Sequence, residues 1–203
     1  METSLTFFYT GDLRGDLDIL PRLYTLLKSL RARVTEGRTL YVDIGGACVA
    51  DVWHCDISGG RSMVIVLDGM GCAAANVSSS IDDESRAKMG DNTVIALVDA
   101  AHDHVVDELA FTLTPPAQVE IGVLAIVLAP DTITALRDQI LRLGAVRAGQ
   151  IGMASVENVD QRWGLTSYAV HDLPANTPPD PTITAAVDFV LSEARYTQKR
   201  RGN

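Results

Sequence analysis

The residues with the clearest chemical potential follow the first apolar stretch of the chain. Residues 5–9 predict a buried strand, and Gly11-Asp12-Leu13-Arg14-Gly15 predicts a tight turn at its carboxyl end. In α/β proteins, ligands bind at such turns. The Arg14 guanidinium could bind a phosphate or carboxylate through two hydrogen bonds. It could instead form an internal salt bridge with Asp12 or Asp43, which is the interpretation we favour.

Two histidines lie two positions apart in Ala101-His102-Asp103-His104. In an extended segment, His102 and His104 would face the same side and could bind one metal ion. We favour a simpler interpretation, a polar loop after a strand predicted over residues 94–98. His54 could supply a further ligand, but an isolated histidine is more often structural or solvated.

A glycine-rich segment could bind a nucleotide. Asp68-Gly69-Met70-Gly71 follows an apolar run and imitates a dinucleotide-binding fingerprint, with Asp99 at the end of a possible next strand. The following residues include Ser78-Ser79-Ser80 and Asp82-Asp83, which are poor helix formers and acidic where a pyrophosphate needs a helix N-terminus. The serines have no evident base, so nucleophilic catalysis has no support. Nucleotide binding through residues 69–74 is therefore a minor alternative.

Composition and charge restrict the class of protein. The chain has 203 residues, 47% hydrophobic and 21% charged, which suits one folded domain with a sizeable core. The formal net charge of -9 excludes nucleic acid as a general partner, because phosphate binding needs a basic face. Lys199, Arg200 and Arg201 form the one basic cluster. We divide the chain into a domain over residues 1–197 and a basic tail over residues 198–203.

The sequence also bears on location and redox state. No apolar run reaches the roughly 18 residues that a membrane-spanning helix needs, and Met1-Glu2-Thr3 lacks the basic start of a signal peptide. We expect a cytoplasmic protein with no membrane partner, whose oligomeric state stays open. Cys48, Cys55 and Cys72 are an odd number of cysteines without the spacing of a disulfide framework or a zinc site. They should be buried free thiols.

Hydrophobic periodicity predicts alternating strands and helices. The amphipathic run from Asp18 to Val34 predicts a helix, with Asp18 as its cap and Pro21 in its first turn. Because this helix joins two strands through short connections, those strands should be parallel. The run over residues 62–70 fits either a strand or a helix. Further expected elements are a strand over 39–43, an exposed loop over 78–92 with Gly90 near its end, strands over 94–98 and 119–128, a break over 111–118, a helix from Asp131 to Gly144, a hairpin over 151–156 and 165–171, a linker over 176–180, and a last helix from Asp180.

Several segments follow one another in an order typical of one enzyme family. They include a strand, an Asp-containing turn and a Leu-Pro-Arg-Leu helix start, then an apolar strand ending in Asp-Ile-Gly-Gly. In this order the chain resembles the 5′-nucleotidase branch of the calcineurin-like metallophosphoesterases, and the resemblance makes residues 62–70 a helix. The segments that carry it are residues 9–23, 42–46, 60–77, 150–152 and 178–181.

The resemblance implies a site with two metal ions, in which a bridging hydroxide attacks phosphorus. Asp12 matches the first Asp ligand, but Arg14 stands where the family has a His, and a guanidinium cannot bind a cation. The bridging Asp falls on Gly46, whereas Asp43 matches a non-ligand Asp of the strand. The family's Asn-His pair falls near Ser79-Ser80. The resemblance therefore implies loss of the two-metal activity.

We predict a single α/β domain, a layered metallophosphoesterase-like sandwich. Its central strands should be mostly parallel, with helices on both faces and a few antiparallel strands. The predicted function is that of a degenerate relative of the 5′-nucleotidases without phosphate-ester hydrolysis, a pseudoenzyme that needs no cofactor. It would act as a binding or interaction module for an unknown protein or a small phosphate-containing ligand.

Two alternatives stay open. The first is an active phosphoric ester hydrolase with a reduced site for Mn, Zn or Fe. Its metal would lie on Asp12, Asp43 and a histidine, which could be His54, His102 or His104. The second is the nucleotide-binding protein described above.

Overall fold

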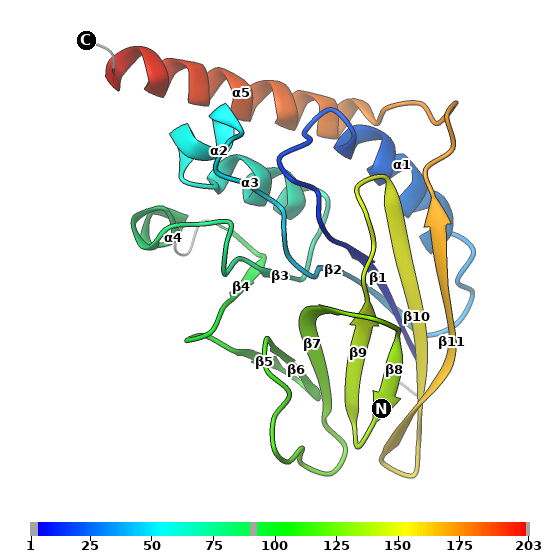
Figure 1. Cartoon of the computed structure of the whole chain (residues 1–203). Helices are drawn as coiled ribbons and strands as arrows, with labels where there is room; N and C mark the ends of the chain where they lie inside the picture. Colours follow the sequence, from blue (N-terminus) through cyan, green and yellow to red (C-terminus); the bar gives the residue numbers. More distant parts are fainter. Residues whose placement is uncertain (1–3, 90–92, 202–203) are drawn as a thin grey trace.

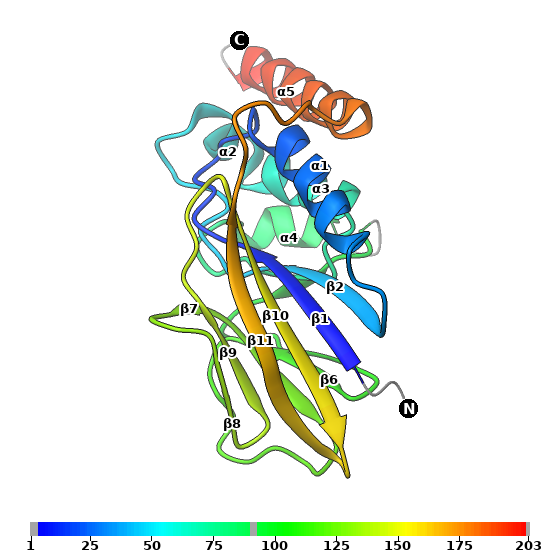
Figure 2. The same cartoon turned by 90° about the vertical axis from the view of Figure 1, so that its right-hand side faces the viewer.

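Two β-sheets and a layer of helices make up the protein, whose computed structural model describes residues 4–89 and 93–201 (Figure 1). In this part of the chain the larger sheet has six strands, in the order β11-β10-β1-β2-β3-β4, and the smaller has five, in the order β5-β6-β7-β9-β8. The helices cover one face of the larger sheet, and the smaller sheet covers the other (Figure 2). The predicted layered α/β sandwich is confirmed, but the expectation of helices on both faces is wrong.

The larger sheet is built around β1, the strand predicted from the first apolar run. β1 pairs in parallel with β2, as predicted, and the parallel series continues through β3 and β4. On its other side β1 pairs antiparallel with β10, which forms the predicted hairpin with β11. The strands are β1 (Ser4–Thr10), β2 (Arg38–Asp43), β3 (Ala74–Asn76), β4 (Ala96–Val98), β10 (Gln150–Val159) and β11 (Arg162–Asp172).

The smaller sheet corrects one sequence prediction. β7, which begins later than the predicted strand, pairs in parallel with β6 and β9. The helix predicted from Asp131 to Gly144 is wrong, because this segment forms an antiparallel hairpin turning at Asp138 and Gln139, with φ angles of 52° and 65°. Such angles suit a two-residue hairpin turn. The strands are β5 (His104–Val106), β6 (Leu109–Thr112), β7 (Leu124–Asp131), β8 (Ala135–Arg137) and β9 (Ile140–Gly144).

The helices agree with most of the sequence predictions. The ambiguous run forms helix α3, as the resemblance implies, and the last helix begins after Asp180, whose Oδ1 accepts from the N–H groups of Thr182 and Ile183. Asp18 is not the cap of α1, because Ile19 stands at the cap position and no side chain caps the helix. Asp16 Oδ1 accepts from the Ile19 N–H. No helix in the described ranges is long and apolar enough to cross a membrane. The helices are α1 (Leu20–Arg31), α2 (Trp53–Ser58), α3 (Arg61–Gly69), α4 (Asp83–Met89) and α5 (Pro181–Arg201).

The predicted loop and the basic cluster both include helical residues. The predicted loop over residues 78–92 contains α4, and its end, including Gly90, lies outside the described residues. Lys199, Arg200 and Arg201 lie in the last turn of α5, where positive charges interact favourably with the negative end of the helix dipole.

Two apolar cores hold the layers together. The first lies between the helices and the larger sheet and includes Phe8, Leu23 and Met63. The second lies between the two sheets and includes Phe7 and Ile126. Alternate residues of β1 therefore face different cores, which explains why this strand is apolar along its whole length.

The cysteine prediction is wrong for two of the three residues. Cys48, in the loop after β2, forms a disulfide with Cys55 on α2, and Cys72 is a buried free thiol. The chain folds back between β2 and α2, which brings together two cysteines whose spacing matches no common motif.

Candidate functional site

The loops that follow β1 and β2 lie side by side at the carboxyl edge of the larger sheet. The Asp12 N–H donates to the Gly45 carbonyl and the Arg14 N–H donates to the Gly46 carbonyl, each with an N···O distance of 2.8 Å. These bonds join the loops beyond the end of the parallel ladder. The predicted turn therefore lies where ligands bind in α/β proteins.

Both loops contain left-handed backbone. Asp12 and Arg14 have φ angles of 51° and 54°, and Gly45 and Gly46 have φ angles of 110° and 73°. Glycine adopts such angles freely, but a residue with a side chain does so at a cost of about 1–3 kcal/mol. Backbone of this kind in non-glycine residues is concentrated at functional loops.

The predicted ion pair of Arg14 forms with Asp12. Arg14 Nη1 lies 3.6 Å from Asp12 Oδ1, and the two side chains are 62% and 56% exposed. The pair is thus at the surface rather than internal, and it adds little to stability. Its main effect is to place a fixed cation beside the Asp12 carboxylate.

Asp43 is buried in the interior beside Thr10. Its Oδ2 accepts from the Thr10 hydroxyl (2.8 Å), and its Oδ1 accepts from the Gly45 N–H (3.0 Å). The Thr10 oxygen in turn lies 2.8 Å from the Tyr41 hydroxyl. Burial raises the pKa of Asp43 to about 7 despite these bonds. This carboxyl belongs to the core, below the loop that it supports.

A cavity of about 490 Å³ opens between the ends of the two sheets. Asp12 and Gly46 line it from the first two loops, and Asn76 and Ser79 line it from the end of β3. Arg147, just before β10, adds a cation. One carboxylate, one guanidinium, one amide and one hydroxyl therefore line the cavity beside the predicted turn after β1.

Sequence reasoning missed Asn76 and Arg147. Asn76 Nδ2 donates to the Ile44 carbonyl (3.2 Å) and to the Leu128 carbonyl (2.7 Å), so it links β3 to both sheets. As a polar residue ending a short strand, Asn76 could have been found from its place at the strand's carboxyl end. No local pattern marks Arg147.

The backbone leaves little space for a side chain at Gly46. A Cβ built there would lie 3.0 Å from the Asp12 Cα and 3.2 Å from the Asp12 nitrogen. Gly46 also has a positive φ angle, which disfavours a residue with a side chain. An aspartate that would bridge two metal ions is therefore disfavoured at this position. The residues of this edge therefore do not fit a two-metal centre.

The candidate metal ligands are not brought together. Within residues 4–89 and 93–201, no group of three or more His, Cys, Asp or Glu side chains could hold a metal ion. His102 Nδ1 lies 2.8 Å from Asp99 Oδ1, and the His104 ring stacks on Phe111. His104 is the first residue of β5, so the predicted polar loop ends at that point.

His54 has a structural role. Its buried ring has Nδ1 2.8 Å from the Ser62 hydroxyl and Nε2 2.9 Å from the Gly15 carbonyl. Because a carbonyl can only accept, Nε2 carries the proton and donates. Burial lowers the pKa of His54, and this neutral ring fixes the end of the loop after β1.

The glycine-rich segment lacks the geometry of a dinucleotide site. Gly69 is the last residue of α3, and Ala74 begins β3. The fingerprint needs the reverse order, a strand before the glycines and a helix after them.

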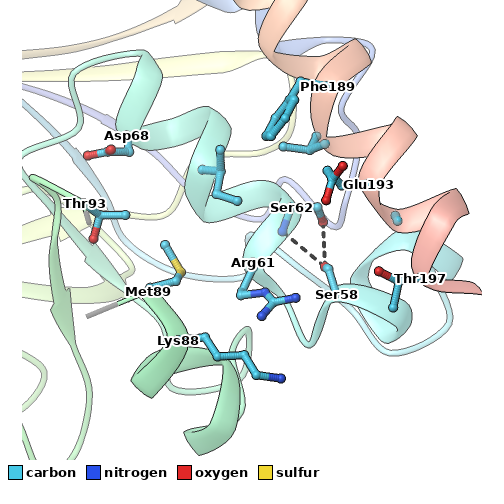
Figure 3. Close-up of a pocket in the computed structure, with 13 residues that line it drawn as sticks. Ser58, Arg61, Ser62, Asp68, Lys88, Met89, Thr93, Phe189, Glu193 and Thr197 are labelled. Carbon is cyan, nitrogen blue, oxygen red and sulfur yellow. Dashed lines mark hydrogen bonds between the residues drawn. The ribbon is translucent and has the colours of Figure 1, made fainter. Parts of the chain in front are cut away.

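A second cavity, of about 390 Å³, lies between α3, α4 and α5. Figure 3 shows Arg61 and Lys88 on one side of it and Phe189 of α5 on the other. Ser58 and Ser62, which also line it, are joined by hydrogen bonds. This cavity is remote from the carboxyl ends of the strands, so the first cavity is the better candidate for a site of the kind that the resemblance implies.

Comparison with known proteins supports the fold. The structure is similar to the calcineurin-like phosphoesterase YfkN from Bacillus subtilis, with a TM-score of 0.61, 12% identity and coverage of 98% of this chain and 100% of that chain. It is also similar to the sulfate thiohydrolase SoxB from Thermus thermophilus, with a TM-score of 0.59 and 11% identity over 93% of this chain and 60% of SoxB. The chain thus spans less than two thirds of SoxB. No family model and no curated protein matches the sequence.

Proposed function

We propose that the chain is a degenerate relative of the calcineurin-like phosphoesterases, of the 5′-nucleotidase type, that binds a ligand or partner without hydrolysing a phosphate ester. The observation that carries this proposal is the close approach of Gly46 to Asp12. It obstructs the position that the resemblance assigns to the bridging carboxylate. A dinuclear centre needs that negative charge to hold two cations close together.

Arg14 supports the same conclusion. Its guanidinium lies beside Asp12, the one family ligand that the sequence retains. A permanent positive charge there repels a cation and competes for the carboxylate. Asp43 does not compensate, because it is buried and already bonded to Thr10 and Gly45.

The cavity beside these loops is the proposed binding site. Arg147 offers a cation to a phosphate, and the Ser79 hydroxyl adds a small polar group. Asn76 shapes the wall of the cavity, because its amide nitrogen already donates to two backbone carbonyls. We therefore infer a small phosphate-containing ligand. Asp12, on the same cavity, would accept hydrogen bonds from hydroxyl or amino groups of that ligand.

The location of the protein is a separate question. Disulfides such as Cys48–Cys55 persist in oxidising compartments and are rare in the reducing cytoplasm. This bond therefore favours an oxidising compartment over the predicted cytoplasmic location.

Metal content and hydrolysis test the loss of activity. The purified chain is incubated with manganese or zinc, freed of excess metal and assayed for bound ions and for hydrolysis of bis(p-nitrophenyl) phosphate. We expect less than one ion per chain and no hydrolysis above buffer, with Asp12→Asn indistinguishable from wild type. Two ions per chain would contradict the proposal, as would hydrolysis that Asp12→Asn abolishes in a folded protein. The second outcome would favour the active phosphoesterase.

A separate experiment tests the ligand class. Titration with inorganic phosphate, followed by amide NMR, should shift signals of residues 11–12, 45–46 and 147. Arg147→Gln should remove these shifts and leave the rest of the spectrum unchanged. Shifts that are absent, or unchanged in the variant, would contradict a phosphate site in this cavity whatever the metal result.

A further inference from the structure

The outer edge of β11 is open over half of the strand. β11 ends the six-stranded sheet, and no other strand of the described part of the chain pairs with its outer edge (Figures 1 and 2). At the start of β11, the Trp163 N–H donates outward to Gln139 Oε1, so the smaller sheet satisfies that part of the edge. A register shift between Ser155 and Val156 then separates this part from residues 167–172.

The backbone groups on the open edge can be identified. The Leu173 N–H donates to the Gly149 carbonyl, toward the β10 side. Since backbone groups alternate along a strand, those of Tyr168, Val170 and Asp172 face away from β10. The described residues show no backbone hydrogen bond from these three positions to another element.

This edge lacks the usual protection against pairing. Edge strands commonly carry Lys, Pro or a bulge that discourages another strand. Residues 167–171 include no Pro, Lys, Arg, Asp or Glu, and the register shift lies before them. The side chains of Tyr168 and Val170 are nevertheless 58% and 49% exposed. The open segment is thus partly apolar, with Asp172 at its end as the one acidic or basic residue among Asp, Glu, Lys and Arg.

We propose that two copies of this chain associate through antiparallel pairing of their β11 edges about a two-fold axis at Val170. Val170 would lie opposite the partner's Val170, and Tyr168 opposite the partner's Asp172. Each such pair exchanges two backbone hydrogen bonds. The contact joins the two larger sheets into one continuous sheet. None of its residues lines the proposed ligand cavity.

Side-chain chemistry favours a second copy as the occupant, in this register. The Tyr168 hydroxyl is a donor, and the Asp172 carboxylate, which already accepts from Gln150 Nε2, has a free acceptor oxygen for it. Centring the pair on Asp172 instead would place two carboxylates opposite each other. Centring it on Tyr168 would pair Val170 with Thr166, where the register shift interrupts the strand.

The molar mass in solution tests the proposal. Sedimentation velocity or light scattering, over a concentration series reaching the upper micromolar range, should show twice the 21.8 kDa mass of one chain. Val170→Lys should give a folded monomer, because two ammonium groups would meet at the axis. Val159→Lys, at a 64% exposed position away from the open edge, should remain dimeric. A monomeric wild type, including one that binds only a different protein, would overturn the proposal, and so would a dimeric Val170→Lys protein.

Cross-linking tests the register without disturbing charge. Antiparallel hydrogen-bonded pairs have Cα atoms about 5.5 Å apart, within the range of a disulfide. Oxidation of Val170→Cys, or a short bifunctional thiol reagent, should therefore produce a covalent dimer. Tyr168→Cys should not cross-link to itself in this register, and Val159→Cys should stay monomeric on a denaturing gel. Cross-linking of Tyr168→Cys without that of Val170→Cys would reject the Val170 axis.

Discussion

Gly46 lies so close to Asp12 that a Cβ at position 46 would be 3.0 Å from the Asp12 Cα. The two residues lie in the loops after neighbouring parallel strands, and both have left-handed backbone. In the family that the sequence resembles, both positions carry metal-binding carboxylates. Here position 46 has no side chain, and a Cβ added there would be in tight contact with the Asp12 backbone.

This contact predicts that Gly46→Ala is more harmful than another glycine substitution of the same backbone type. Gly122 also has a positive φ angle, of 87°, but a Cβ there would meet no atom within 4 Å. Both substitutions should lower the free energy of unfolding by about 1 kcal/mol because of the left-handed backbone. Gly46→Ala should lose about 1–3 kcal/mol more, because its methyl group forces the loops apart.

Urea unfolding of the two variants, with unchanged m-values, measures the difference. Equal losses would mean that the Gly46 and Asp12 loops separate easily. The position could then accept a side chain, and the argument against a bridging carboxylate would fail.

The sequence predicted correctly those segments in which the periodicity of apolar residues matches the packing in the fold. β1, α1 and β2 follow from an apolar run, a helical stripe and a second apolar run, and the structure packs each as its period requires. The segment over 131–144 shows the opposite case. Leu136, Ile140 and Leu143 fit a helical spacing, but Leu141 and Leu143 are the fully buried residues, as in a strand. Pairing with β7 and packing against the larger sheet, which a local pattern does not contain, selected the strand.

The position of the turn after β1 was predicted from the sequence, but the surroundings of its residues were not. The turn around Asp12 was identifiable because a strand end, two glycines and an acidic residue coincide. The burial of Asp43 was not, because its environment comes from Thr10 and Tyr41 on paired strands. Arg147 reaches the cavity from a loop more than a hundred residues away from Asp12, so only the fold brings them together.

The cap of α5 provides a second prediction. Asp180 accepts from two N–H groups of the first turn and pairs with Lys28 of α1, which fastens the last helix to the first. Asp180→Ala should lower the unfolding midpoint by about 2–4 °C. Asp180→Asn retains an acceptor for the helix N–H groups and removes only the ion pair with Lys28. It should therefore lower the unfolding midpoint by less, and by about as much as Lys28→Met does.

The same cap has a pH dependence with a defined sign. The hydrogen bond from Lys28 lowers the pKa of Asp180. Its contribution to stability is therefore present above the ordinary carboxyl pKa and is lost as the pH falls through the lowered value. The gap between wild type and Asp180→Ala, measured by thermal unfolding, should shrink in acid. A gap that widened in acid would contradict the ion pair.

The disulfide provides a third prediction, which checks the correction to the cysteine assignment. A thiol reagent added to the denatured chain should titrate one cysteine without reductant and all three after reduction. Reduction should lower the free energy of unfolding by about 2–3 kcal/mol, from the loss of a short closed loop. Three titratable thiols in the unreduced chain would contradict the bond, and Cys72→Ala should then still show two.

The buried Asp43 gives the last prediction, for which Asp43→Asn is the test. Burial raises the pKa of this carboxyl to about 7, above its ordinary value of 3.8. The folded state therefore binds a proton that the unfolded state releases, so the contribution to stability is complete below about pH 4 and is lost as the pH rises through 7. Asn keeps the shape and stays neutral, and its amide can bond with Thr10 and Gly45. Urea unfolding across this range should therefore show the free energy of unfolding of Asp43→Asn rising relative to that of wild type as the pH increases, by at most a few kcal/mol. The other carboxyl groups contribute equally in both proteins, so their contributions cancel in the difference. A difference that does not change with pH would mean that Asp43 is ionised in the fold at acidic pH, with a partner or water at its carboxylate.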